Sequence, residues 1–162
     1  MRYTTLLGLV LMFPASAIAQ DVPVGCYTRD YSDAHLASNP DQVVDRISIE
    51  FIRHDEFTSA EVKVLLTDQG HSGRAGYGGQ FVSEVAANYA TPLQFGIECD
   101  GGSIDVIDSD SQGIVIETGW FRLSDNANGC TGEYIRSNLH EEVGSSTRYR
   151  LTQSAAAACK WE

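Results

Sequence analysis

The sequence predicts an all-β fold, an antiparallel barrel or sandwich of about seven to eight strands with one short N-terminal helix. Apolar and polar residues alternate over short segments, which is the pattern of strands with one face buried and one face in water. The segments recur about every ten to fifteen residues, with Gly, Asp, Asn or Ser between them. Such short connections favour antiparallel pairing, because parallel strands need long crossovers. We favour the barrel over the sandwich, because hairpins that close on themselves leave no exposed edge.

Seven segments carry the alternation, and each is expected to contribute to a strand. In the first of them, Ile47, Ile49 and Phe51 alternate with polar neighbours. A strand directs successive side chains to opposite faces, so these three residues should share the buried face. The apolar members of the later segments are Val62, Val64 and Leu66; Leu93, Phe95, Ile97 and Cys99; Ile104 and Val106; Ile114 and Ile116; Phe121 and Leu123; and Tyr149 and Leu151.

Two segments depart from the alternation and favour helical turns. Residues 32–37 begin with Ser32, which can cap a helix, followed by an acid and by residues without β-branching. This helix must end near Asn39, because the residue before Pro40 is driven out of helical geometry. The alanine run 155–158 could form a second short turn near the C-terminus.

The first 19 residues have the features of a secretory signal peptide. Arg2 precedes an apolar run from Leu6 to Phe13, and Ala17-Ile18-Ala19 matches an Ala-x-Ala cleavage site. Cleavage after Ala19 would leave a single domain of 143 residues, 20–162, which is long enough to bury a hydrophobic core. We therefore expect an exported protein, either periplasmic or extracellular.

The mature chain is strongly acidic, with ten basic and 22 acidic side chains and a net charge of −12. Such a charge repels a phosphate backbone, so we exclude nucleic acid as a partner. The N-terminal apolar run is shorter than the ~20 residues needed to cross a bilayer, and no later segment is apolar enough. We expect no membrane span and no cofactor, and the sequence leaves the oligomeric state open.

Four cysteines follow the predicted cleavage site, and an even number in an exported chain indicates disulfides. No two of them lie closer than 29 residues, so the close pairs typical of a zinc site are absent and we expect no metal. Three pairings are possible. We predict Cys26–Cys159, which ties the two ends of the domain together, and Cys99–Cys130.

The motifs of catalytic and metal sites are each incomplete. Residues 108–113 place oxygen ligands like a calcium loop, but Gly119 stands where the loop needs Glu, so we predict a hairpin turn. Residues 70–73, Gly-His-Ser-Gly, lack one spacer of a nucleophile elbow and precede more glycines, so we predict a flexible surface loop. The four histidines are scattered along the chain. On these grounds we expect no enzyme.

The stretch after Cys26 holds the best candidate for ligand binding. In an extended segment Tyr27, Arg29 and Tyr31 share one face, and His35 follows within the expected helix. Two phenols beside a guanidinium could clamp a ligand by stacking and by bidentate hydrogen bonds. The alternative is structural, with the tyrosines covering one end of the barrel and Arg29 paired with a nearby acid.

Between Arg74 and Arg122 the chain has no basic residue but seven carboxylates. If the strands of residues 93–118 are neighbours, Asp105, Asp108 and Asp110 lie on an acidic surface that attracts a cationic protein or peptide. The sequence therefore predicts a secreted, non-catalytic binding protein. Two alternatives stay open. A small-ligand-binding barrel needs a lined cavity, and a secreted hydrolase needs a histidine within hydrogen-bond reach of a carboxylate.

Overall fold

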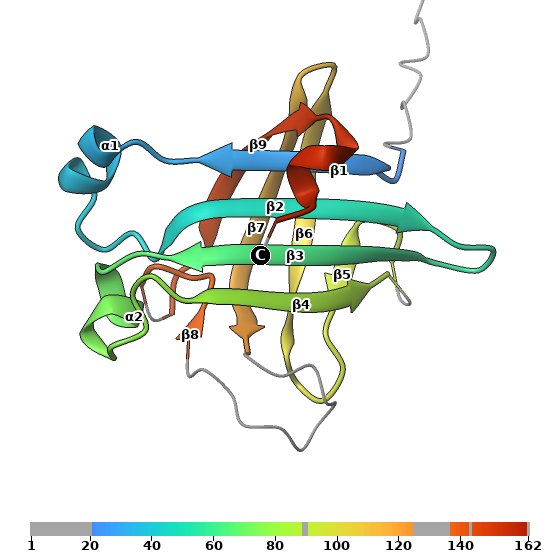
Figure 1. Ribbon diagram of the computed structural model, residues 1–162. Coiled ribbons are helices and arrows are strands. Elements are labelled where there is room, and N and C mark those ends of the chain that lie inside the picture. Colours follow the sequence, from blue (N-terminus) through green and yellow to red (C-terminus); the bar gives the residue numbers. More distant parts are fainter. Residues whose placement is uncertain (1–20, 89–90, 125–136, 143, 162) are drawn as a thin grey trace, which may run out of the picture.

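Eight antiparallel strands close into a barrel in the computed structural model of the chain (Figure 1). The all-β prediction is confirmed, and of its two forms the structure has the barrel. The structure describes residues 21–88, 91–124, 137–142 and 144–161. The predicted signal peptide, residues 1–19, lies outside these ranges.

Each strand of the barrel pairs with the strands before and after it in the chain, so the wall follows the order β1 to β7 and then β9, which returns to β1. A very short strand, β8, pairs with the end of β7. The strands are β1 (Gly25–Asp30), β2 (Val44–Arg53), β3 (Thr58–Leu66), β4 (Phe81–Ala87), β5 (Gln94–Gly96), β6 (Gly102–Asp110), β7 (Gly113–Leu123), β8 (Ser137–Asn138) and β9 (Thr147–Ser154). The helical segments are α1 (Asp33–Ser38), α2 (Gly70–Arg74) and the 3-10 turn η2 (Ala156–Cys159).

A short helix, α1, follows β1 at one end of the barrel. The Ser32 side-chain oxygen accepts a hydrogen bond from the backbone N–H of His35 at 3.3 Å, which caps the first turn. The helix ends at Ser38, two residues before Pro40. Its place therefore agrees with the local signals of a capping serine and a following proline.

The glycine-rich stretch after β3 differs from its prediction as a flexible loop, because it begins with the helical turn α2. Gly70 has a φ of 58°, and a Cβ there would lie 2.5 Å from the backbone oxygen of Asp41. Only glycine can turn the chain so close to a neighbouring segment. Ser72, two residues later, is fully buried. Packing against the barrel therefore orders a segment whose composition alone indicates mobility.

Large apolar side chains fill the barrel. Phe51, Phe95, Phe121 and Tyr149 are each at most 1 % exposed, and the Phe51 and Phe95 rings meet edge to face with centroids 4.8 Å apart. An eight-stranded barrel is just wide enough for its own side chains to occupy its interior. These side chains take the space that a small ligand would need at the centre of a hollow barrel.

The C-terminal segment is fastened across the outside of the barrel. Cys159 forms a disulfide with Cys26, as predicted, with the two Cα atoms 6.0 Å apart. Beyond the disulfide the chain crosses β1 and β2 towards β3 (Figure 1). There the indole N–H of Trp161 donates to the Ser48 hydroxyl at 2.8 Å, and the Arg46 guanidinium lies 4.5 Å from the centre of the indole ring.

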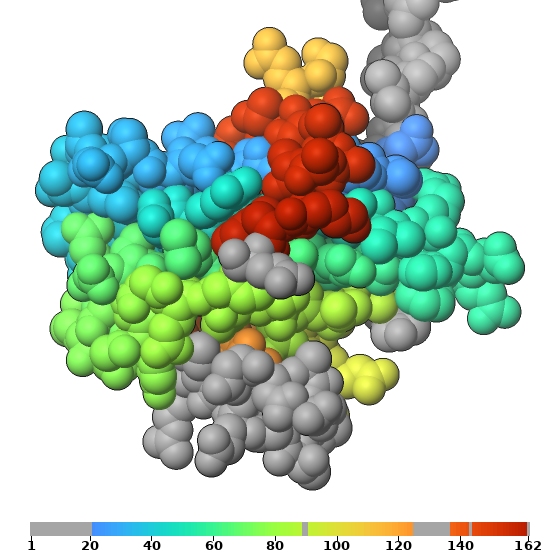
Figure 2. Space-filling view, viewed as in Figure 1, coloured from blue at the N-terminus to red at the C-terminus, as the bar shows by residue number. Residues whose placement is uncertain are grey.

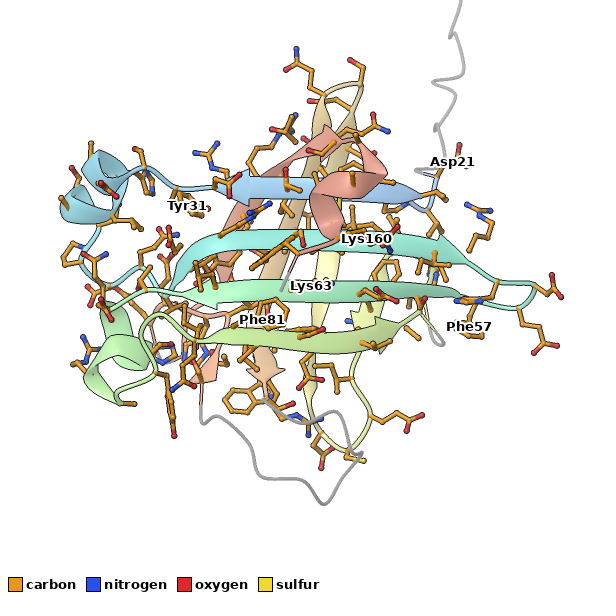
Figure 3. All side chains as sticks on the ribbon, in the orientation of Figure 1. Asp21, Tyr31, Phe57, Lys63, Phe81 and Lys160 are labelled. Carbon is orange, nitrogen blue, oxygen red and sulfur yellow. A yellow bond between two sulfur atoms is a disulfide. The ribbon has the colours of Figure 1, made fainter. Side chains whose placement is uncertain are left out.

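Charged side chains hold the same segment on either side of the tryptophan (Figure 3). Lys160 donates to Glu50 at 2.6 Å, and Lys63 donates to the backbone oxygen of Trp161 at 3.2 Å. Phe81 packs edge to face on the indole, with ring centroids 5.2 Å apart. The C-terminus is thus attached to four consecutive strands of the barrel wall.

Cys99 is also disulfide-bonded. Its predicted partner, Cys130, lies outside the described residues, so the pairing of these two cysteines stays a prediction.

Candidate functional site

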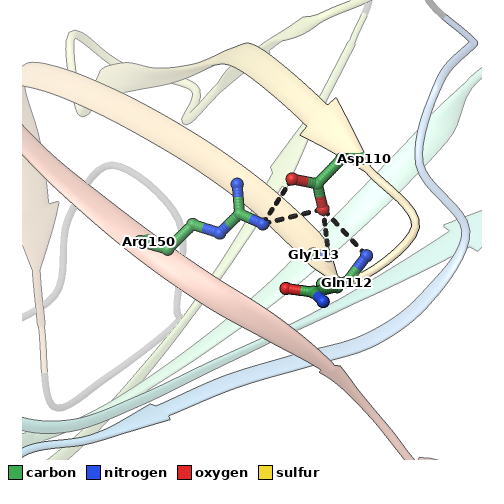
Figure 4. Close-up of polar contacts among 4 residues, drawn as sticks. All are labelled: Asp110, Gln112, Gly113 and Arg150. Atoms are coloured by element: carbon green, nitrogen blue, oxygen red, sulfur yellow. Dashed lines mark hydrogen bonds and ion pairs between the residues drawn. The ribbon is translucent and has the colours of Figure 1, made fainter.

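The hairpin that joins β6 to β7 is organised by Asp110 (Figure 4). Its carboxylate accepts the backbone N–H groups of Gln112 and Gly113 at 2.8 and 3.0 Å. One Arg150 nitrogen, Nη2, donates to both carboxylate oxygens at 2.7 Å. These hydrogen bonds, first of all those from Arg150, lower the pKa of Asp110. The segment is the predicted turn, and the Asp110 carboxylate is engaged within the chain rather than free for a partner.

A second arginine of β9 neutralises another carboxylate of this surface. Glu117 lies directly opposite Arg148 in the β7–β9 pairing, and the arginine Nε donates to it at 2.7 Å. This hydrogen bond lowers the pKa of Glu117. Arginines of β9 therefore neutralise part of the negative charge of residues 75–121, which contain no Lys or Arg, because β7 lies between β6 and β9.

Two carboxylates of β6 lie on the outer surface of the barrel, where Asp108 is exposed and Asp105 is half-buried. Asp105 and Asp108 point outward, and no salt bridge to either is found in the described part of the chain. Ile107 is 39 % exposed and Trp120 is 49 % exposed. The Trp120 indole N–H donates to the backbone oxygen of Asp100 at 3.2 Å, which fixes the ring beside the loop before β6. We call Asp100, Asp105, Ile107, Asp108 and Trp120 together the acidic face.

The predicted ligand clamp is assembled only in part. Arg29 lies over the Tyr31 ring, 4.9 Å from its centre, and Tyr31 stacks on His35 with centroids 4.7 Å apart. His35 is within 3.3 Å of the Gln42 side-chain oxygen. Burial raises the pKa of the Tyr31 phenol. These residues gather beside α1, where Figure 3 labels Tyr31.

Tyr27 does not belong to this group. Its side chain is 8 % exposed and packs edge to face on Phe51 in the core, with ring centroids 5.8 Å apart. Tyr27 and Arg29 share one face of β1, as the alternation predicts. Tyr27, however, lies deeper in the barrel, whereas Arg29 lies near the end beside α1. Tyr27 is structural, in line with the alternative stated from the sequence, whereas no ion pair between Arg29 and a described acid is found.

A buried carboxylate that the sequence analysis did not select lies on β4. Glu84 occupies an inward position between Val82 and Ala86 and is 4 % exposed. It accepts a hydrogen bond from the Ser124 hydroxyl and lies 3.7 Å from Nε of Arg122, which is 15 % exposed. Burial raises the pKa of Glu84. A charge in the apolar phase of an alternating segment is the signal that could have identified it.

Beside this carboxylate, little backbone pairing closes the barrel wall among the described residues. β4 pairs with β5 at a single position, Ala87 with Gly96. β5 ends after three residues, and the chain then turns through Cys99 and Asp100, whose φ angles are 60° and 58°. A cleft of about 470 Å³ lies where the two strands separate, and we call it the β4 cleft. Its lining includes residues 84–87 of β4, residues 96–99, and the side chains of His54, Phe57, Ser59 and Arg122.

The hydrogen bonds of the histidines do not form a catalytic arrangement in the described residues. His54 is within 2.9 Å of the Ser59 hydroxyl, and the Nε2 atom of His71 is 2.8 Å from the backbone oxygen of His140. None of the described histidines forms an ion pair with a described carboxylate, which is the contact that the hydrolase alternative requires. The described part of the chain also has no cluster of three or more residues suited to a metal ion.

Comparisons with protein-family models, with curated proteins and with solved structures found no match to this chain. Among the described residues, no helix has the length and apolar character needed to cross a membrane.

Proposed function

We propose that this protein is a non-catalytic binding protein that recognises a cationic protein or peptide through the acidic face. The observation that carries the proposal is that the outer surface of β6 and β7 presents Asp108, Ile107 and Trp120 as exposed side chains and Asp105 as a partly exposed one. Tryptophan is enriched among the residues that dominate protein interfaces, and carboxylates on the same surface favour a basic partner. The neighbouring arginines, Arg148 and Arg150, are held by acids of this same surface.

We further propose that the protein acts outside the cytoplasm, in the periplasm or beyond the cell. The signal-like N-terminus and the disulfide between Cys26 and Cys159 support this location, because disulfides persist in oxidising compartments.

Binding of decalysine, measured by tryptophan fluorescence and calorimetry, tests the proposed function. Binding should be clear at low salt and should weaken strongly at ~0.3 M salt, because exposed charges are screened over less than ~10 Å there. The double variant Asp105→Lys/Asp108→Lys should bind about tenfold more weakly or worse. Asp110 is left unchanged, because its loss would also disturb the hairpin.

The matched control is Asp55→Lys/Glu56→Lys, which makes the same change in net charge at the exposed β2–β3 hairpin. This control should retain most of the binding if the acidic face is the site. Equal weakening in both double variants would show that only net charge matters, and unchanged binding in the first would rule out the acidic face.

A further inference from the structure

The hydrogen-bond pattern between β3 and β4 identifies which backbone groups of β4 face the open side of the wall. At the two ends of the pairing, the Leu66 N–H donates to the Gln80 oxygen and the Asn88 N–H donates to the Thr58 oxygen. In an antiparallel ladder hydrogen-bonded positions alternate. Residues 80, 82, 84, 86 and 88 therefore bond to β3, and residues 81, 83, 85 and 87 direct their N–H and C=O groups to the opposite edge.

Beside three of these four residues, no paired strand is found in the described part of the chain. Ala87 pairs with Gly96 of β5. For the backbone N–H and C=O groups of Phe81, Ser83 and Val85, no hydrogen-bond partner is found within the described residues. Val85 is 55 % exposed, and yellow-green atoms, the colour of β4, are seen in a band across the middle of Figure 2. A row of unpaired backbone groups on an exposed strand is a template for pairing with another chain.

We propose that this edge of β4 binds an extended, basic peptide segment by β-strand addition. The inference rests on the proposed function, because it gives the binding mode for a segment of the same cationic partner. In strand addition, backbone hydrogen bonds supply affinity and side-chain environments on the two faces supply specificity. The β4 cleft provides the space, since it runs beside residues 84–87 of β4 and is bounded on its far side by residues 96–99.

The charges around the edge favour a basic occupant. Glu84 points inward from β4, and an inward-pointing charge makes pairing with a wholly apolar strand costly. Glu98 lines the cleft, and Glu61 lies directly opposite Val85 on β3. Arg122, which also lines the cleft, already faces Glu84. Lys63 lies opposite Ser83 on β3, so a strand that brings Lys or Arg side chains would face three carboxylates and two basic groups here.

Two peptides of equal charge separate strand addition from simple electrostatic attraction. The first is acetyl-Lys-Val-Lys-Val-Lys-Val-Lys-amide, and the second is the same peptide with every backbone amide N-methylated. Strand addition requires peptide N–H donors, so the methylated peptide should bind about tenfold more weakly or worse. In hydrogen exchange followed by NMR, the amides of Phe81, Ser83 and Val85 should be fast in the free protein. The first peptide should slow them by at least ~10-fold.

A variant of the protein tests the same edge from the other side. Val85→Pro removes an N–H that faces the open edge and leaves the ladder to β3 intact, because proline is tolerated where the missing donor faces solvent. Val85→Thr keeps the N–H and the β-branched shape, and it serves as the matched control. The proline variant should lose about tenfold in affinity for the first peptide, and the threonine variant should not. If the proline variant fails to fold, the peptide pair and the exchange rates decide.

Two results would overturn strand addition while leaving the proposed function in place. One is equal, salt-sensitive binding of both peptides without protection of the three amides. The other is slow exchange of these amides in the free protein, which would mean that the edge is already covered. Absence of salt-sensitive binding for both peptides and for decalysine would overturn the proposed function itself, and the inference with it.

Discussion

Removing the Cys26–Cys159 disulfide should destabilise the protein far more than its position on the surface of the barrel suggests. The bond joins residues 133 positions apart, so it closes nearly the whole domain into one loop. In the chain-entropy model, a loop of that length restricts the unfolded chain by about 5 kcal/mol. A second disulfide nested within this loop would lower the figure by only a few tenths, because the dependence on length is logarithmic.

Urea unfolding of Cys26→Ala/Cys159→Ala tests this expectation. With an m-value of about 2 kcal/mol/M, the midpoint should fall by about 2.5 M. The m-value should also rise, since an untied unfolded chain exposes more surface. Near-UV circular dichroism checks that the native packing around Trp161 persists, because the contacts of this residue with Ser48 and Arg46 do not depend on the sulfur atoms. A midpoint within ~0.5 M of the wild type would refute the reasoning that the link acts by restricting the unfolded chain.

Three further predictions concern single side chains. Burial raises the pKa of Glu84 above 4.5, so the folded protein takes up this proton first and the contribution of Glu84 to the free energy of unfolding rises as the pH falls from neutral. Urea midpoints between pH 7 and pH 4 should show this rise in the wild type relative to Glu84→Gln, and parallel curves would contradict it. Burial, with the charge of His71 second, lowers the pKa of His140 below 6.5. The free energy of unfolding should therefore fall as the pH drops through 6.5, where the unfolded chain takes up the proton first, and an NMR titration midpoint of His140 at or above 6.5 would exclude this. Gly102→Ala should destabilise by more than about 2 kcal/mol in urea unfolding, because its φ is +81° and a Cβ would lie 2.0 Å from the Trp120 oxygen. Gly119→Ala, where a Cβ meets nothing within 4 Å, is the control and should change stability little.

The alternation of side chains predicts most of the barrel, but it misses β4. The inward residues of β2, Ile47, Ile49 and Phe51, are apolar, and their period of two is readable from the sequence alone. In β4 the inward phase contains Glu84, so the pattern does not look like a buried face. Partners from the far side of the barrel, Ser124 and Arg122, make this burial possible. No local signal in β4 reveals them.

The candidate site, too, has features that the sequence predicts and features that only strand pairing decides. The run of carboxylates without basic residues between Arg74 and Arg122 is a property of the sequence, and so is the placement of Tyr27, Arg29 and Tyr31 on one face. Which of these carboxylates form ion pairs was decided by the pairing of β7 with β9, which brings Arg148 and Arg150 to Glu117 and Asp110.

By itself, then, the sequence determined the class of fold, the strand faces and the overall charge, because each follows from the chemistry of neighbouring residues. Only the tertiary structure decided the depth of Tyr27, the hydrogen-bond and charge partners of Glu84, and the edge of β4 for which the described residues supply no partner. These depend on which residues, distant along the chain, are brought within a few ångströms when the barrel closes, and hydrogen bonds, charge pairs and burial act only over such distances.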